Sequence, residues 1–269
     1  MPVEKELPLV TLTTDIGWSY ASQMKATLLR GIPSLRIVDM THEVPSHQVL
    51  EGAFLIRYCC VGFPAGSIHI GVVDPGVGGD RQPIIMQCKD GTILVGPDNG
   101  LLVPLAEHLG EPKTYRISRE KVAPDAWVSP TFEGRDLFAP AAALMAKGTS
   151  PGELGEPTNY MPFHFPQPTF EGNMISAAVL HVDHFGNVIT NLPTVDFIGK
   201  QVDFGEWVAI GTSTHHFRAP VVKTYEELPQ GGLGVVGSSF GLVEVSVNKG
   251  RARDFLGLWP GSRFTIHKV

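Results

Sequence analysis

Alternation between short apolar runs and amphipathic segments is the feature of this sequence that most restricts its fold. Runs typical of buried strands lie at residues 9–13, 36–40, 68–73, 84–87 and 92–95. Apolar residues with helical spacing occur at 23–31, 50–60, 100–108 and 137–147. Strands that alternate with helices in this way pack as a mostly parallel sheet covered by helices. Residues 1–165 are therefore predicted to form an α/β domain.

The pattern changes after residue 148. Five prolines between residues 148 and 168 indicate a linker. From residue 172 onward, strand-like runs dominate and few helical periods occur; the runs lie at 175–182, 188–190, 207–210, 235–236 and 242–247. The remainder of the chain, residues 170–269, is therefore predicted to be a smaller all-β domain.

Composition excludes several classes of protein. Hydrophobic residues make up 43% and charged residues 18% of the chain, which is enough apolar material for a substantial core. The formal net charge is −6 and no cluster of lysine and arginine occurs, so nucleic acid is not an expected partner. The longest apolar stretch, residues 53–63, is interrupted by Arg57 and is too short to cross a membrane.

Cysteine usage and the first residues predict a cytoplasmic protein. The three cysteines have neither metal-binding spacing nor an even number, and the adjacent Cys59 and Cys60 are interpreted as reduced core residues. The first residues, MPVEKELPLVTLTTD, show no signal-peptide pattern.

Three acidic turns follow predicted strands of the first domain. They contain Asp15 in TTDIG, Asp74 in VVDPGVGGDR, and Asp98 with Asn99 in GPDNG. Each aspartate alone can be explained as the cap of a turn or helix. Ligand sites in α/β sheets lie beyond the carboxyl ends of the strands, however, so three such turns together indicate a site.

The glycine-rich loop after Asp74 narrows the chemistry. DPGVGG lets backbone amides approach a small ligand or water, but it lacks the lysine and hydroxyl residue of a phosphate-binding P-loop. Asp74 and Arg81 can pair across this loop and hold a water, or they can form an ordinary surface ion pair. The histidines show no metal-binding spacing, so no metal site is predicted.

Other segments carry weaker indications. SPTFEGRDLFAP places Glu133 and Asp136 before a predicted helix, where a carboxylate also stabilises the helix N-terminus. In HVDHFGNVITN, Phe185 and Asn187 suit stacking and edge hydrogen bonding to a purine, although FGN is also a common turn. Ser238 and Ser239 lie in a turn flanked by glycine that suits a carboxylate ligand.

Taken together, these segments resemble the S-adenosyl-L-methionine hydroxide adenosyltransferases, relatives of fluorinase and chlorinase. The matching stretches run from residue 11 to residue 250 and read LTTDIG, THEVPSHQVLEGA, VVDPGVGGDR, VGPDNGLL, SPTFEGRDLFAPAAA, DHFGNVITNLP and SSFGLVEVSVNKG. The resemblance implies a Rossmann-like α/β domain joined to a barrel-like β domain. It also implies a homotrimer whose sites lie between the N-terminal domain of one subunit and the C-terminal domain of its neighbour.

The implied activity is hydrolysis of S-adenosyl-L-methionine to adenosine and methionine, with no cofactor or metal beyond the substrate. By resemblance, the water is oriented by Asp74 and Arg81, and the ribose hydroxyls are bound by Asp15. The resemblance also places Phe132 and Gly134 at the reacting 5′ carbon. It places Phe185, Asn187 and the backbone from Val247 to Lys249 at adenine. It places Asp183 and Ser239 at the methionine amino and carboxylate ends.

Two departures from the family pattern bear on activity. Family hydrolases have histidine in TFHGRD, where this chain has Glu133, which accepts but does not donate a hydrogen bond when ionised. The segment IGWSYASQMK is shorter than the usual loop and has no acidic residue before Tyr20. Glu133 is interpreted either as a replacement proton acceptor or as a change that slows the reaction.

Three alternatives to the hydrolase remain. The halogenating relatives carry tyrosine in place of Asp74 and a long loop after it; here the aspartate is present and only 23 residues separate it from Asp98, which favours water over halide. A protein that binds adenosine or S-adenosyl-L-methionine without turnover is the second alternative, motivated by Glu133. The third, a metal-dependent hydrolase, rests on the acidic turns alone.

Overall fold

The computed structural model describes residues 7–124 and 128–269, so residues 1–6 of the predicted first domain lie outside it. The chain divides into two compact units, the first ending at His164 and the second comprising Phe165–Val269. Within the described residues, no helix combines the length and apolar character needed to cross a membrane.

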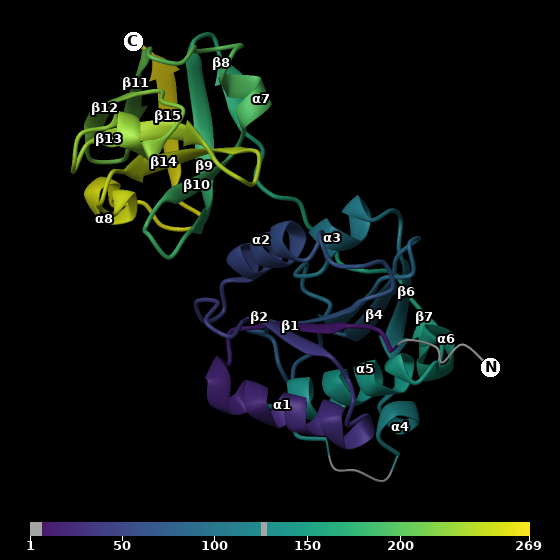
Figure 1. Ribbon diagram of the computed structural model, residues 1–269. Helices are drawn as coiled ribbons and strands as arrows, with labels where there is room; N and C mark the ends of the chain where they lie inside the picture. The colour runs from purple at the N-terminus through teal and green to yellow at the C-terminus, as the bar shows by residue number, and fades with distance from the viewer. Residues whose placement is uncertain (1–6, 125–127) are drawn as a thin grey trace, which may run out of the picture. The chain divides into compact units, whose positions relative to one another are not determined.

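The first unit is built on a seven-stranded mixed sheet (Figure 1) with the order β2-β1-β3-β5-β4-β6-β7. The strands are β1 (Val10–Thr14), β2 (Ile37–Thr41), β3 (Ile68–Val72), β4 (Pro83–Gln87), β5 (Ile93–Pro97), β6 (Lys113–Ile117) and β7 (Gly155–Pro157). The pairings among β2, β1, β3 and β5 are parallel, whereas those of β4 with β5, β4 with β6 and β6 with β7 are antiparallel.

The prediction of a mostly parallel sheet is therefore confirmed for β2, β1, β3 and β5 and wrong for β4, β6 and β7. The chain between β4 and β5 is the short KDG turn, in which the N–H of Cys88 donates to the carbonyl of Thr92 (2.9 Å) and that of Gly91 to Cys88 (3.1 Å). A parallel connection needs a crossover of a dozen or more residues, so this turn forces β4 to run antiparallel to β5.

Helices cover both faces of this sheet. Helices α1 (Gly17–Gly31) and α5 (Ala139–Ala146) pack together on one face, and α2 (Val49–Cys59) and α3 (Val103–His108) on the other (Figure 1). The short helices are α4 (Arg119–Val122) and α6 (Pro151–Leu154), and a π-helical turn, η1 (Gly134–Phe138), leads directly into α5.

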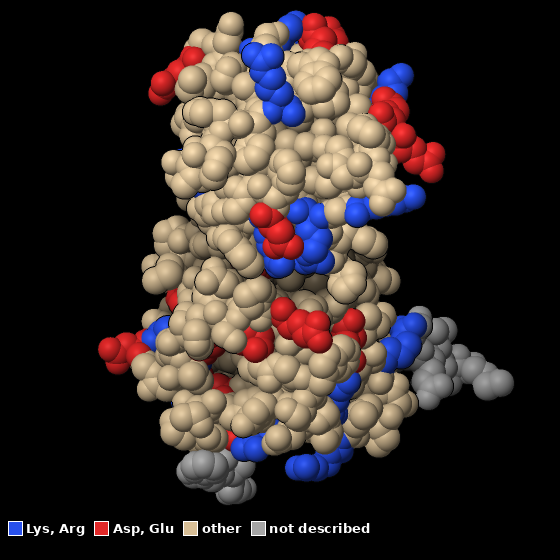
Figure 2. All heavy atoms as spheres, turned by 90° about the vertical axis from the view of Figure 1, so that its left-hand side faces the viewer, with Lys and Arg blue, Asp and Glu red and all other residues tan. Residues whose placement is uncertain are grey.

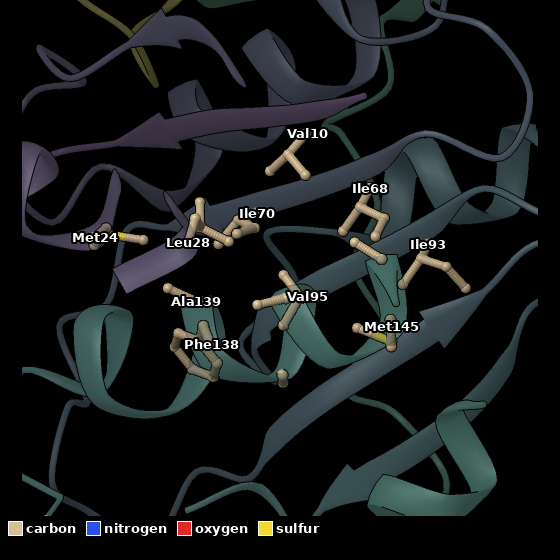
Figure 3. Packing of buried hydrophobic residues seen from close by; sticks show 14 of the residues in the cluster. Val10, Met24, Leu28, Ile68, Ile70, Ile93, Val95, Phe138, Ala139 and Met145 are labelled. Carbon is tan, nitrogen blue, oxygen red and sulfur yellow. The ribbon is translucent and has the colours of Figure 1, made fainter. Parts of the chain in front are cut away.

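The main core lies between the parallel strands and the α1–α5 layer. Figure 3 shows Ile70 and Val95 from the strands beside Leu28 of α1 and Phe138 of η1, all of them buried. Strands β1 and β3 are buried along their whole length, as expected for strands covered on both faces. Because Phe138 is fixed in this core, the positions of the residues immediately before it are restricted.

The path of the chain creates a switch point between β1 and β3. The chain passes from β1 through α1 to β2 on one side, and then through α2 to β3 on the other side of β1. Loops leaving the carboxyl ends of β1 and β3 therefore diverge, and such a crevice is where open α/β sheets bind ligands. Asp15 follows β1 and Asp74 follows β3, so both predicted site residues lie at this point.

The second unit is an eight-stranded sheet with the path β12-β11-β15-β9-β10-β14-β13, and β8 pairs with β9. All the strand pairings that form the sheet are antiparallel, and a bridge between Val221 and Val235 brings its two ends together, so the sheet is nearly barrel-shaped. The elements are β8 (Thr169–Glu171), β9 (Met174–Val182), β10 (Val188–Pro193), α7 (Thr194–Phe197), β11 (Trp207–Gly211), β12 (His216–Pro220), η2 (Tyr225–Glu227), β13 (Leu233–Gly237), β14 (Leu242–Val247), α8 (Ala252–Leu256) and β15 (Arg263–Lys268).

Candidate active site

Asp15 is fixed at the end of β1 by backbone contacts on two sides. Its N–H donates to the carbonyl of Val72 (3.2 Å), and its Oδ2 accepts the N–H of His47 (2.9 Å). His47 adopts a φ of +69°, an uncommon conformation for a residue with a side chain. Helix α1 starts at Gly17, two residues after Asp15, so the segment IGWSYASQMK is helical from Gly17 onward.

A polar network starts at Thr14, the residue before Asp15. The Oγ1 of Thr14 bonds to Nδ1 of His42 (3.0 Å), and Nε2 of His42 bonds to Asp39 (3.0 Å). Lys25 completes the network with an ion pair to Asp39 (2.8 Å). Burial raises the pKa of Asp39, but the hydrogen bonds and charges of Lys25 and His42 outweigh it and hold that pKa below its usual range. Sequence reasoning missed this network because its members lie on three separate elements.

Asp74 and Arg81 form a bidentate ion pair across the glycine-rich loop. Nε of Arg81 donates to Oδ1 of Asp74 (3.1 Å), Nη2 contacts Oδ2, and the N–H of Gly76 also donates to Oδ1 (3.2 Å). The side chains of Asp74 and Arg81 are only 5% and 10% exposed. A surface pair is held weakly and screened by water, whereas this pair is largely shielded from it. The surface-pair interpretation is therefore wrong.

One glycine of this loop makes a close approach that no other residue permits. Gly78 has a φ of +77°, and a Cβ atom there would lie 2.7 Å from the carbonyl oxygen of Pro130. The loop consequently lies directly against the segment that carries Phe132 and Glu133. This contact brings together two parts of the sequence that are more than fifty residues apart.

Glu133 joins the pair as a buried second carboxylate. It is 1% exposed, its Oε2 forms an ion pair with Nη2 of Arg81, and its Oε1 pairs with Nη2 of Arg119. Arg81 is therefore paired with two carboxylates, those of Asp74 and Glu133. Burial lowers the pKa of Arg81, but Asp74 and Glu133 together outweigh burial and raise it.

Arg119 is the functional residue that sequence reasoning missed most clearly. It lies fourteen positions before Glu133 along the chain. No sequence motif links the two residues. Their contact depends on how α4 packs against the site.

Phe132 and Gly134 flank Glu133, as the sequence places them. The Phe132 ring meets Tyr20 edge-on, with centroids 5.3 Å apart, and the guanidinium of Arg135 lies 4.9 Å from the Phe132 ring. A Cβ atom on Gly134 would come within 3.1 Å of the Met24 sulfur, so the backbone passes close to α1 here. The π-helical turn that begins at Gly134 is a type often found at functional sites.

Asp136 and the third acidic turn have structural roles. Asp136 accepts the N–H of Ser129 (3.0 Å) and pairs with Arg135, which supports the interpretation of this carboxylate as a local cap. Asn99 donates to the carbonyl of Val73 (2.9 Å), and Asp98 accepts the N–H of Met161 (2.8 Å). The contact of Asn99 ties the turn after β5 to the end of β3, and that of Asp98 ties it to the segment around Met161.

In the second unit, Asp183 and Asn187 close a turn that displays Phe185. The backbone and side-chain nitrogens of Asn187 each donate to Asp183 (both 2.9 Å). Phe185, at the tip, is 71% exposed, which leaves its ring free to stack on a ligand. The carbonyl of Gly186 accepts the N–H of Arg253 (2.9 Å), so this turn lies against the segment that follows β14.

The remaining predicted residues divide between the two ends of β14. Val247 and Lys249 lie at the end next to the Phe185 turn, with Val247 buried and Lys249 at a φ of +54°. Ser238 and Ser239 lie in the turn that precedes β14, at its other end. The six-residue strand β14, about 20 Å long, lies between the two groups.

A buried carboxylate on β14 was not anticipated. Glu244 is 4% exposed and accepts hydrogen bonds from Tyr225 (2.8 Å) and Ser246 (2.6 Å). Burial, together with the nearby charge of Asp183, raises the pKa of Glu244.

The surface of the first unit also carries negative charge. On the face shown in Figure 2, acidic side chains gather, which favours approach of a cationic ligand.

The fold and the site define a class: an α/β unit with a buried carboxylate–arginine cluster at its switch point, followed by a nearly barrel-shaped β unit. Residues 10–155 match the model of the SAM hydroxide adenosyltransferase N-terminal domain, and residues 177–265 match that of the corresponding C-terminal domain. The chain belongs to the SAM hydroxide adenosyltransferase family.

Individual relatives agree with this assignment. The chain is 37% identical to the (R)-S-adenosyl-L-methionine hydrolase of Salinispora arenicola, covering 96% of this chain and 97% of that protein. The fluorinase of an Actinoplanes species is more distant, at 28% identity over 85% of this chain and 87% of that protein. The crystal structure of an uncharacterized conserved protein from Thermotoga maritima superposes with a TM-score of 0.89 at 33% identity, covering 96% of this chain and all of that one.

Proposed function

We propose that this protein hydrolyses S-adenosyl-L-methionine to adenosine and L-methionine by in-line attack of water at the ribose 5′ carbon. A C5′–O bond forms as the C5′–S bond breaks, and both electrons of the broken bond stay on sulfur. The positive sulfonium leaves as a neutral thioether, and the water gives up one proton. Because the leaving group is already activated by its charge, the reaction needs no general acid, metal or cofactor.

The observation that carries this proposal is the buried Asp74–Arg81 pair at the switch point. A water that donates to Asp74 and accepts from Arg81 has one lone pair left to direct at carbon. Holding a reactant in the attacking geometry is worth about 7–11 kcal/mol in the best intramolecular cases. Asp74 is also placed to accept the proton that the water loses. Glu133, which is paired with Arg81 and Arg119, is a second carboxylate within the same cluster.

The substrate contacts follow from the two units. Asp15 binds the ribose hydroxyls, and Phe132 and Gly134 line the 5′ carbon. On the second unit, Phe185 and Asn187 with the backbone of Val247 to Lys249 hold adenine. The methionine end is bound by Asp183, Ser238 and Ser239. We further propose a cytoplasmic homotrimer in which each site combines the first unit of one subunit with the second unit of another. In this proposal the parallel part of the first sheet corresponds to a Rossmann-like core.

The relatives' name adds a stereochemical element. They are called (R)-S-adenosyl-L-methionine hydrolases, and we extend this preference for the (R) sulfonium epimer to the present chain. The presence of Asp74 supports water over halide as the nucleophile.

The proposal is tested by incubating the purified protein with each sulfonium epimer and separating the products by chromatography. We expect equal amounts of adenosine and methionine, formed faster from the (R) epimer, with a rate unaffected by chelators or by chloride. Tight binding without turnover would replace the hydrolase by a binding protein. A halogenated adenosine would identify a halogenating enzyme, and loss of activity with chelators a metal-dependent one.

A further inference from the structure

The ion pairs of Glu133 connect the proposed site to a residue on the surface helix α4. Glu133 is 1% exposed and lies between Arg81 and Arg119, one at each carboxylate oxygen. Arg81 is paired at the same time with Asp74. The four side chains therefore alternate in charge, and Arg119, whose side chain is 43% exposed, is the outermost member.

We propose that Arg119 is a positioning residue for the hydrolysis: it acts through Glu133 to fix how Arg81 is shared between Glu133 and Asp74. The inference rests on the proposed function, because it assigns a role within the same reaction. Among the described residues Arg119 is paired with Glu133 and not with Asp74, so its influence passes through Glu133.

The electrostatics of the cluster give the reason. Without Arg119, two largely buried carboxylates would share one guanidinium. A buried carboxylate that loses one counter-ion either draws the other cation closer or takes up a proton. If Glu133 draws Arg81 toward itself, the bidentate grip on Asp74 weakens and the water loses its support. Arg119 satisfies Glu133 from the opposite side and prevents this.

Helix α4 is constructed to hold Arg119 in this place. Ser118 caps the helix by accepting the N–H of Lys121 (3.3 Å), and its own N–H donates to the carbonyl of Leu154 (2.9 Å). The second cation of the helix, Lys121, pairs instead with Glu156 (3.0 Å), and its side chain is 42% exposed. Lys121 is thus a matched control, with the same helix, charge and exposure but no contact with Glu133.

A double variant separates positioning from simple stabilisation. The charged groups facing Glu133 are Arg81 and, behind it, Asp74 from the loop between β3 and β4, and Arg119 from α4; on its own segment Arg135 pairs with Asp136. In Arg119→Gln, Glu133 has Arg81 as its remaining counter-ion and competes with Asp74 for it. Replacing Glu133 by glutamine in the same chain removes this competition, so the activity lost in Arg119→Gln should return.

The test measures kcat and KM for S-adenosyl-L-methionine. The variants are Arg119→Gln, Lys121→Gln, Glu133→Gln and the double variant Arg119→Gln/Glu133→Gln. We expect Arg119→Gln to lose roughly tenfold or more in kcat with KM within about twofold of wild type, and Lys121→Gln to stay within about twofold of wild type in both. The double variant, with no carboxylate at position 133, should regain the kcat of Glu133→Gln. Wild-type kcat in Arg119→Gln, or a double variant no better than Arg119→Gln, would overturn the proposal.

Failure of the proposed function is recognised separately. Wild-type protein that forms no adenosine contradicts the hydrolysis but leaves the pairing to be tested by unfolding. In that case Arg119→Gln should lower the midpoint of thermal unfolding, and adding Glu133→Gln should recover it. An equal decrease with and without Glu133 would refute the pairing itself.

Discussion

Replacing Asp74 by asparagine removes the carboxylate charge while keeping the shape of the side chain. The variant loses the ion pair to Arg81 (Nε to Oδ1, 3.1 Å) and the acceptor for the proton of the water. Arg81 retains Glu133 as counter-ion, so no buried charge is left uncompensated. The stability loss should be that of a charge-assisted hydrogen bond, about 1.5 kcal/mol, or a decrease of about 3–6 °C in the unfolding midpoint.

The catalytic loss should be much larger. Removal of a general base typically lowers the rate by about 10²–10⁴-fold, and we expect kcat to fall within that range while substrate binding is nearly unchanged. Adenosine formation by chromatography measures the first quantity and calorimetric titration the second. Asp98→Asn is the matched control, since Asp98 follows the neighbouring strand β5 and its carboxylate accepts the N–H of Met161, with no ion pair among the described residues. If Asp74→Asn kept more than about a tenth of wild-type kcat, Asp74 would not be the base.

Three further outcomes follow from the structure. Gly78→Ala should lower the free energy of unfolding by about 1–3 kcal/mol and should also lower activity, because a φ of +77° and the nearby Pro130 carbonyl leave no room for Cβ. Unfolding and kcat measurements check this. Unchanged values would contradict the described loop. Phe185→Ala should raise KM roughly tenfold without changing the unfolding midpoint, since the ring is 71% exposed and stacks only when adenine is bound; an unchanged KM would remove it from the adenine site. Burial lowers the pKa of His69 to about 4. Between about pH 6.5 and about pH 4 the folded state therefore binds fewer protons than the unfolded state. The free energy of unfolding should fall by about 2 kcal/mol on acidification to about pH 5. Chemical denaturation should show this loss in wild type and a smaller one in His69→Gln, with His164→Gln, at an exposed position, as control; equal losses in all three would contradict it.

The parts of the fold that the sequence predicted are those fixed by local pattern. Strands β1 and β3 are continuous apolar runs, and the turns after them carry aspartate and glycine, so both the strands and the site edge could be located. Strand β6, which reads KTYRI, mixes exposed, intermediate and buried residues without a strong apolar signal and was missed. The direction of β4 depends on its pairing with β5 and β6, which no local pattern encodes.

The candidate site shows the same division. Asp74, Arg81 and Glu133 were identified from motifs, and the structure brings these three together. The partner of Glu133 on α4 was not identified, because a contact between separate elements depends on packing. What was interpreted as an isolated departure at position 133 is in the structure one half of a charged pair with Arg119.

The most direct test of the central claim follows the oxygen atom of the water. Hydrolysis of S-adenosyl-L-methionine in ¹⁸O-labelled water should place one heavy oxygen in each adenosine formed, at the 5′ hydroxyl, and none in methionine. Mass spectrometry of the two products with fragmentation of adenosine locates the label. Unlabelled adenosine, or a label elsewhere in the products, would contradict attack of water at the 5′ carbon.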